Sequence, residues 1–236
     1  VGVSDGQIEI IPCGVDQHRF ESTVVDREAI RTKYGIPLDK FVYVTVGRNH
    51  PKKGFPILVE ALAEMKRAGT IGNAHAVFVG LRMSDLLPQA KELGVVEHIT
   101  LIEELGHDSN DREYRIPSAP LVEIYKSVDA CAFPSLIETF AMINIEAMAA
   151  GIPVISTDAP GCIETINDGV DGLIAKAGDP IDLARKMEQL QSSADLQAKL
   201  SANGTESVRK SFSWDVVGRQ FEDLYLSLTE RSNEIS

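Results

Sequence analysis

The chain has 236 residues, of which 44% are hydrophobic and 25% charged, proportions typical of a globular protein with a sizeable core. Its formal net charge is −12, from 35 acidic and 23 basic residues. A surface of that sign repels phosphate backbones and disfavours nucleic acid as a partner. No apolar run approaches the length of a membrane span, and no signal peptide is visible.

The cysteines and the first residues indicate where the chain functions and how it is organised. Cys13, Cys131 and Cys162 lack a C-x-x-C spacing, so we expect reduced, structural thiols in a cytoplasmic protein. The chain starts with Val1 rather than Met, which we interpret as a cut inside a longer protein. We expect residues 1–236 to form one domain, with 1–20 as a linker and first strand and 213–236 as a C-terminal helix.

Short apolar runs bounded by turn residues predict strands, which in chain order are Ile8–Ile11, Phe41–Gly47, Ala76–Gly80, Ile99–Ile102, Ala130–Phe133, Val154–Ser156 and Gly172–Ile174. Helical patterns occupy Arg27–Lys33, Phe55–Ala68, Ser84–Leu93, Val122–Ser127, Phe140–Ala150, Ile181–Gln191, Ala194–Lys210 and Trp214–Thr229. Near-continuous apolar strands that alternate with helices indicate a parallel sheet covered on both faces. The sequence therefore predicts an α/β fold with a doubly wound, Rossmann-like parallel sheet, which binds ligands at the carboxyl ends of its strands.

The stretch that follows the second predicted strand is basic and rich in turn residues. Gly47 lets the chain turn sharply, and Arg48 and Lys53 follow at the strand's end, where a bound diphosphate would lie. Arginine offers a planar fork for phosphate oxygens, and lysine offers a point charge. An ordinary basic loop between a strand and a helix is the alternative interpretation, although a basic cluster is more informative in an acidic chain.

A second candidate site runs from Glu138 to Glu146. Thr139 is predicted to cap a helix that begins just after it, so that Glu138 lies at the mouth of the helix and Glu146 about two turns inside. At about 1.5 Å per residue the carboxylates lie roughly 12 Å apart, about the reach from a ribose across a diphosphate to a sugar. The amides of the first turn lie between them, and a helix N-terminus favours anions. Two solvated glutamates on a charged helix are the alternative.

The stretch from Glu138 to Glu146 resembles the E-x7-E signature of retaining glycosyltransferases of family 4, also called glycosyl transferases group 1, which have the GT-B fold. Arg48 and Lys53 resemble the G-R and K-G element of the same family. Other segments that resemble family elements, in the family's order, are Ile11–Phe20, Val77–Gly80, Tyr125–Ser135 and Asp158–Glu164. The resemblance implies the C-terminal, donor-binding domain of such an enzyme, with the N-terminal acceptor domain absent from this chain.

The resemblance also implies a role for each matching residue. Glu138 would contact hydroxyls of the donor sugar, Glu146 the ribose, and Arg48 and Lys53 the diphosphate. The candidate catalytic residues are Glu138, Arg48 and Lys53. The candidate donor-binding residues are Gly47, Thr139, Phe140, Ala141, Met142 and Glu146, with the amides of Thr139 to Met142 facing the diphosphate and the sugar. Ala141 stands where the family often has glycine, which puts the shape of the sugar pocket in doubt.

We expect neither a metal nor a cofactor. The chain has no Asp-x-Asp, which removes the usual metal–diphosphate clamp of the other glycosyltransferase fold class, and its histidines lack ligand spacing. Positive side chains and a helix dipole would stabilise the leaving diphosphate instead. The implied reaction is the retaining transfer of a hexose from a UDP- or GDP-linked sugar to a glycan or lipid-linked acceptor, as in polysaccharide biosynthesis. The missing domain would hold the acceptor, the family's catalytic histidine and any peripheral contact with the inner face of a membrane.

Three other functions have different sequence requirements. A non-catalytic nucleotide-sugar-binding module of GT-B fold would not need all four of the charged site residues named above. An epimerase of GT-B fold would need acid and base residues within this half of the protein. A dinucleotide-binding oxidoreductase needs a G-x-G turn, and the chain contains none.

Overall fold

The computed structural model describes residues 8–103, 105 and 116–234. Its sheet contains six parallel strands in the order β3-β2-β1-β4-β5-β6, and their bounds are β1 Phe41–Val46, β2 Ala74–Val79, β3 Ile99–Ile102, β4 Ala130–Ala132, β5 Val154–Thr157 and β6 Leu173–Ala175. The predicted doubly wound, Rossmann-like α/β sheet is therefore confirmed. The strand order reverses between β1 and β4, the position at which such sheets bind ligands.

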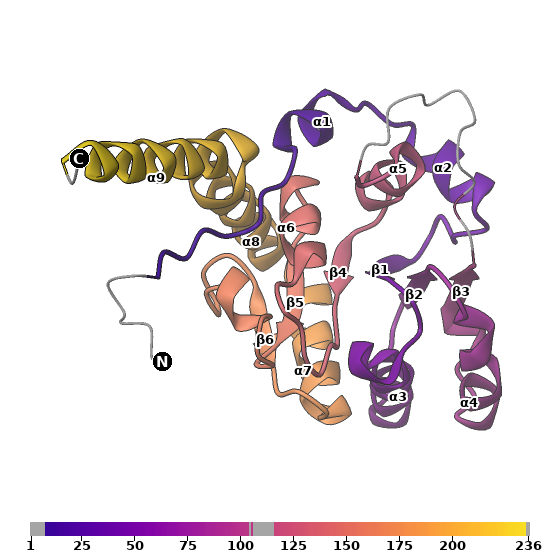
Figure 1. Cartoon of the computed structure of the whole chain (residues 1–236). Coiled ribbons are helices and arrows are strands. Elements are labelled where there is room, and N and C mark those ends of the chain that lie inside the picture. The colour runs from indigo at the N-terminus through magenta and orange to yellow at the C-terminus, as the bar shows by residue number, and fades with distance from the viewer. Residues whose placement is uncertain (1–7, 104, 106–115, 235–236) are drawn as a thin grey trace.

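Helices flank the sheet (Figure 1), and their bounds are α1 Gln17–Ser22, α2 Arg27–Lys33, α3 Phe55–Ala68, α4 Leu87–Glu92, α5 Ala119–Ser127, α6 Met142–Ala149, α7 Pro180–Gln191, α8 Ala194–Ser207 and α9 Trp214–Glu234. Helix α3 packs against α7, α2 against α5, and α6 against α8. The strands β1, β2, β4 and β5 are almost entirely buried, as their near-continuous apolar sequence requires.

Several predicted boundaries are wrong for identifiable reasons. Residues 8–11 form no strand, because no neighbouring strand pairs with them, and Ile8 and Ile10 are 55% and 85% exposed. Further along the predicted entry segment, Val15 forms a single β-bridge with Ser213. The sequence analysis also missed α1, which begins after Asp16, whose carboxylate accepts a hydrogen bond from the Arg19 amide at 3.1 Å.

Two predicted helices are interrupted. The predicted helix over Ser84–Leu93 divides into a 3-10 turn at Met83–Leu86 and helix α4. Helix α8 ends at Ser207, and a π-helical turn over Val208–Phe212 joins it to α9. The sequence of residues 106–120 is polar and rich in turn residues, which predicts a surface loop, and most of it lies outside the described residues. Helix α9 extends away from the sheet at the left of Figure 1.

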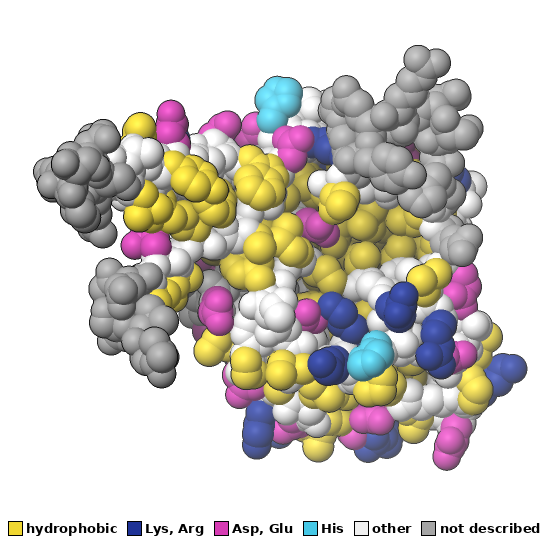
Figure 2. All heavy atoms as spheres, in the orientation of Figure 1, with side chains coloured by type: hydrophobic (Ala, Val, Ile, Leu, Met, Phe, Trp, Pro, Cys, Tyr) yellow, Lys and Arg dark blue, Asp and Glu magenta, His cyan; other side chains and the backbone are white. Residues whose placement is uncertain are grey.

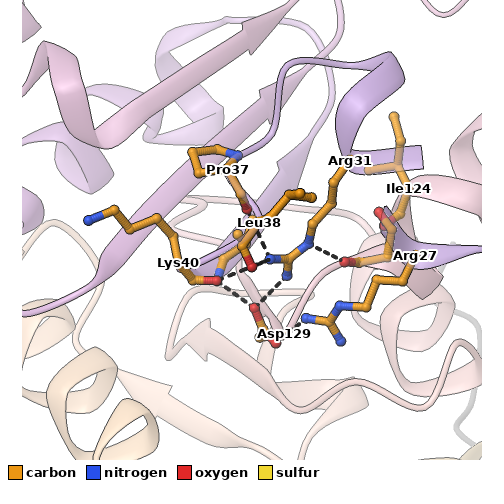
Figure 3. A network of polar contacts seen from close by, with 9 residues as sticks. Arg27, Arg31, Pro37, Leu38, Lys40, Ile124 and Asp129 are labelled. Atoms are coloured by element: carbon orange, nitrogen blue, oxygen red, sulfur yellow. Dashed lines mark hydrogen bonds and ion pairs between the residues drawn. The ribbon is translucent and has the colours of Figure 1, made fainter. Parts of the chain in front are cut away.

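A buried ionic network fastens the amino-terminal ends of β1 and β4 together (Figure 3). Asp129 Oδ2 accepts hydrogen bonds from the Arg31 guanidinium and from the Val42 amide, both at 2.7 Å, and Asp129 also pairs with Arg27. The Arg31 side chain is 3% exposed and donates further to the carbonyls of Ser127 at 2.7 Å and of Pro37, Leu38 and Lys40. Each guanidinium nitrogen of this buried cation therefore has at least one acceptor, and its charge has a counter-ion.

We expect Asp129→Ala to lower the free energy of unfolding by about 3–5 kcal/mol, because it leaves the buried Arg31 cation without a counter-ion. Urea unfolding measures the change. Glu64→Ala, which removes the partly exposed partner of the exposed Arg67, is the control and should leave stability nearly unchanged. Equal effects of the two substitutions would contradict the role assigned to the network.

Candidate functional site

The loops that follow β1 and β4 meet beside the reversal of strand order. The carbonyl oxygen of Lys52, in the loop after β1, accepts a hydrogen bond from the Leu136 amide of the loop after β4 at 2.7 Å. The Ser135 hydroxyl, whose single proton is shared between this carbonyl and the Glu138 carboxylate, lies 2.9 Å from it. The predicted basic loop and the start of the predicted E-x7-E stretch are therefore adjacent, although about 85 residues separate them in the sequence.

Two glycines allow the loop after β4 to pack directly against its neighbours on both sides. Gly54 has a φ of +64°, and a Cβ atom built there would lie 2.0 Å from the Pro134 carbonyl oxygen. Gly161 has a φ of +75°, and its Cβ would lie 2.3 Å from the Glu138 carbonyl oxygen. Both contacts are too short for any side chain, so only glycine permits these approaches. The path of the chain from Pro134 to Glu138 is thus fixed by backbone contacts.

Lys53 and Glu138 form an ion pair across these two loops. Lys53 Nζ lies 2.7 Å from Glu138 Oε1, and Ser135 Oγ lies 2.8 Å from the same oxygen. The side chains of Lys53 and Glu138 are 27% and 13% exposed, so the pair is reachable from solvent. Glu138 Oε2 accepts no hydrogen bond from the residues that the structure describes. The Lys53 ammonium also lies 5.3 Å from the centre of the Phe133 ring, which favours a cation at this position.

Arg48 lies in the same loop but points into solvent. Its side chain makes no ion pair or hydrogen bond with any described residue, and Gly47 before it has a φ of +139°. Basic side chains gather on this face near the beginning of α3, together with a histidine (Figure 2). The exposed or partly exposed basic residues of the loops after β1 and β2 are Arg48, His50, Lys52, Lys53 and Arg82. A positive patch therefore lies at the carboxyl ends of the central strands in an otherwise acidic chain.

The segment between Glu138 and α6 differs from its prediction. Helix α6 begins at Met142 with Ala141 as its N-cap residue, so the predicted cap at Thr139 is wrong. The chain instead continues along the turn at 160–161, with the Glu138 amide donating to the Pro160 carbonyl at 2.9 Å and the Ala141 amide to the Gly161 carbonyl at 3.0 Å. Glu138 therefore precedes the helix, and helical rise does not set its distance from Glu146.

Two of the four amides predicted to face a donor already have acceptors within the chain. The Ala141 amide pairs with Gly161, and the Met142 amide donates to the Phe140 carbonyl at 2.9 Å. The amides of Thr139 and Phe140 have no acceptor among the described residues and remain available to a ligand. The Phe140 ring packs edge-on against Phe212, with ring centres 6.0 Å apart, so its side chain belongs to the contact with the π-helical turn.

Glu146 is buried inside the domain, with only 6% of its surface exposed. Its Oε2 atom accepts a hydrogen bond from the Tyr125 hydroxyl at 3.0 Å. Burial raises the pKa of Glu146 from its ordinary 4.5 to about 7, and the Tyr125 hydroxyl opposes part of that shift. Sequence reasoning placed Tyr125 in a family-like segment without a role. A contact between residues 21 positions apart on two different helices leaves no local signal in a single sequence.

The described residues contain neither a group of side chains suited to a metal nor a helix suited to crossing a membrane. Within residues 8–103, 105 and 116–234, no cluster of three His, Cys, Asp or Glu side chains could hold a metal ion. The expectation of a metal-independent site stays a prediction. No helix in the described part of the chain is both long and apolar enough to cross a membrane.

Replacing Gly161 tests the backbone contact that positions Glu138. We expect Gly161→Ala to lower the free energy of unfolding by at least about 2 kcal/mol more than Gly35→Ala does. Both glycines have a positive φ, so the backbone strain is matched, but a Cβ at Gly35 meets no atom within 4 Å. Urea unfolding of both variants measures the difference, and similar losses of stability would contradict the assigned contact.

The burial of Glu146 makes stability depend on pH. Because its pKa is raised, the folded chain holds a proton more tightly than the unfolded chain between about pH 4.5 and about 7. The contribution of Glu146 to the free energy of unfolding is therefore largest at low pH, and it decreases as the pH rises through that window. We expect Glu146→Gln to remove this slope and to exceed the wild type in stability above pH 7 by about 2–3 kcal/mol.

Thermal unfolding at a series of pH values measures this effect, with Glu64→Gln as the control at a partly exposed glutamate on α3. A Glu146→Gln profile that superimposes on the wild type would contradict the assigned protonation.

Comparison with known proteins identifies relatives of this chain. A family model described as Glycosyl transferases group 1 matches residues 26–207. The D-inositol 3-phosphate glycosyltransferase of Nocardia farcinica is 30% identical over 223 residues, which cover 90% of this chain and 46% of the relative. The enzyme of the same name from Corynebacterium kroppenstedtii is 30% identical over 222 residues, which cover 92% and 48%. The chain spans about half the length of these curated relatives.

Solved structures show the same fold. The Anabaena Alr3699/HepE protein, crystallised with UDP and glucose, superposes with a TM-score of 0.81 at 21% identity, over 96% of this chain and 59% of that protein. The C-terminal domain of the group 1 glycosyl transferase LpcC from Francisella tularensis superposes with a TM-score of 0.68 at 23% identity, over 85% of this chain and 99% of that domain. The family model extends from the beginning of α2 to the end of α8. The chain therefore belongs to the glycosyl transferases group 1 family, and its fold is that of the C-terminal domain of a GT-B glycosyltransferase.

Proposed function

We propose that this chain is the donor-binding domain of a retaining, metal-independent glycosyltransferase that transfers a hexose from a nucleoside diphosphate sugar. The observation that carries the proposal is the Lys53–Glu138 pair, which joins a cation and a carboxylate across the reversal of strand order. A cation there suits a diphosphate, and a carboxylate beside it suits the hydroxyls of the attached sugar.

The donor would extend from the buried Glu146 to the partly exposed Glu138. Glu146 would accept hydrogen bonds from the ribose hydroxyls through Oε1, the oxygen that Tyr125 does not contact. The diphosphate would lie against Arg48, Lys53 and the unpaired amides of Thr139 and Phe140. Glu138 Oε2 would accept hydrogen bonds from the sugar, while its Oε1 stays bound to Lys53 and Ser135.

The same cations support a reaction without a metal. When the bond between the anomeric carbon and the diphosphate breaks, negative charge develops on the leaving oxygen. Arg48 and Lys53 would stabilise that charge, together with the backbone dipoles at the beginning of α6. The acceptor hydroxyl would attack from the face that the diphosphate leaves, and its proton would pass to the leaving phosphate oxygen on that face, which gives retention of configuration. An acceptor such as a glycan or a lipid-linked sugar would bind to a domain outside this chain.

The similar proteins support a nucleotide-sugar donor and suggest a base. The Anabaena Alr3699/HepE protein has been crystallised with UDP and with UDP-glucose, so UDP is the first nucleotide to test, and GDP is the second. The name of the D-inositol 3-phosphate glycosyltransferases describes those relatives, and we assign no acceptor to this chain from it. We propose a cytoplasmic setting for this reaction, because nucleotide sugars are its substrate.

Calorimetric titration of this chain with UDP and GDP tests the proposal. We expect one nucleotide to bind, and Arg48→Ala and Glu146→Ala each to weaken binding by about 1–3 kcal/mol, the usual loss for a charge-assisted hydrogen bond. Arg67→Ala removes an exposed arginine on α3 whose ion pair with Glu64 lies outside the site, and it should bind as the wild type does.

Other outcomes have distinct meanings. Binding that none of the site variants weakens would refute the assigned donor site. Absence of binding to either nucleotide by the folded wild-type chain would contradict the proposal for this domain. Nucleotide-sugar binding by a longer protein that includes this domain but transfers no sugar would favour the non-catalytic binding module.

A further inference from the structure

We infer that Tyr125 is a positioning residue for the donor site. Its hydroxyl holds the Glu146 carboxyl so that one carboxyl oxygen stays directed at the bound nucleotide. The inference rests on the proposed function, because it assigns Tyr125 a role through Glu146. It adds a residue from α5, outside the E-x7-E stretch, to the residues that determine nucleotide affinity.

The hydroxyl of Tyr125 is fixed in place by the packing of its ring. Tyr125 is completely buried in α5, and its ring packs at a tilt against Phe20 of α1, with ring centres 6.3 Å apart. The hydroxyl reaches Oε2 of Glu146 on α6 at 3.0 Å. Because a closely packed ring has one low-energy orientation, this hydrogen bond also fixes the orientation of the carboxyl group.

The contact divides the two carboxyl oxygens between structure and ligand. Oε2 accepts the Tyr125 hydrogen bond, whereas Oε1 accepts none from the residues that the structure describes. Glu138 shows the same division, since Lys53 and Ser135 both lie within hydrogen-bond distance of its Oε1 and no described residue donates a hydrogen bond to its Oε2. Each glutamate therefore uses one oxygen as an anchor and leaves the other for a ligand.

Tyr125 is the described group that favours the ionised form of this carboxyl. Among the described residues, the titratable side chains that interact with Glu146 are Tyr125 from α5 and Cys131 from β4, and no described Lys, Arg or His forms an ion pair with it. Burial raises the pKa of Tyr125 far above its usual range, so the hydroxyl keeps its proton and remains a donor. Without that donor, the buried carboxyl would hold its proton to a higher pH.

Tyr125→Phe tests the inference, because it removes the hydroxyl and keeps the ring. We expect UDP affinity at pH 7 to decrease about fivefold or more, as for the loss of a hydrogen bond to a charged group. We also expect the pH midpoint of binding and the pH midpoint of thermal stability to move upward by about one unit. The second phosphate pKa of UDP, near 6, affects every variant equally, so the difference between variants reports the protein.

Tyr43→Phe is the matched control. Its hydroxyl is also buried and donates to the Met187 carbonyl at 2.6 Å, away from both glutamates. The control should lose stability as Tyr125→Phe does, but keep the wild-type affinity and both pH midpoints. In a Glu146→Gln background, Tyr125→Phe should no longer move either midpoint, because the titrating group is absent.

The possible failures are distinguishable. Wild-type binding with unchanged affinity and unchanged midpoints in Tyr125→Phe would overturn the inference and leave the proposed function intact. Loss of affinity without a shift of either midpoint would reduce Tyr125 to a packing role and would also overturn it. If the wild type binds no nucleotide, the proposed function fails, whereas a shifted midpoint of thermal stability would still establish that Tyr125 controls the Glu146 carboxyl.

Discussion

The candidate site depends on the loop after β4 being held between two turns by backbone contacts. On one side, Gly54 lies against the Pro134 carbonyl, and the Leu136 amide donates to Lys52. On the other side, Gly161 lies against the Glu138 carbonyl, whose own amide donates to Pro160. Main-chain contacts therefore determine the path of the loop, and a change of side-chain rotamer does not alter them. Glu138 and the free amides that follow it are preorganised before any ligand arrives, which reduces the entropy that binding must overcome.

The opposite end of the same two strands is fastened by different means. Asp129, just before β4, binds the Val42 amide of β1 and the buried Arg31 cation. This ionic network fixes the pairing of β1 and β4 at their amino-terminal ends, while the glycine contacts fix the loops at their carboxyl-terminal ends. The strand pair at the reversal of order is thus constrained at both ends, and the groups that could meet a ligand lie between rigid supports.

The sequence predicted the elements well where local pattern and global fold agree. The predicted bounds are correct for Arg27–Lys33, Phe55–Ala68 and Ile99–Ile102, since amphipathic helices leave a periodic signal and a short apolar run bounded by turns marks a strand. Ile8–Ile11 was predicted as a strand from its apolar residues, but strands need a partner, and a single sequence does not reveal one. Thr139 is not the N-cap residue of α6, although its residue type favours that position. The tertiary contacts with Gly161 keep residues 138–141 outside the helix, which begins at Met142. For the same reason, the proximity of Lys53 and Glu138 followed only from strand order, and the Tyr125 contact was not predictable at all.

Glu138 and Glu146 have the same side chain but very different surroundings, and these surroundings suit their different proposed ligands. Glu138 is partly exposed and pairs with the Lys53 ammonium, so its carboxylate has a counter-ion beside the proposed diphosphate and sugar. Glu146 is buried beside a hydroxyl and has no ionic partner among the described residues, so its pKa is raised to about 7, near neutral pH. A ribose that donates hydrogen bonds to such a carboxylate replaces the water that burial removed, and binding and ionisation then favour each other. The buried end of the site therefore responds to pH, whereas at the partly exposed end Lys53 supplies Glu138 with a counter-ion.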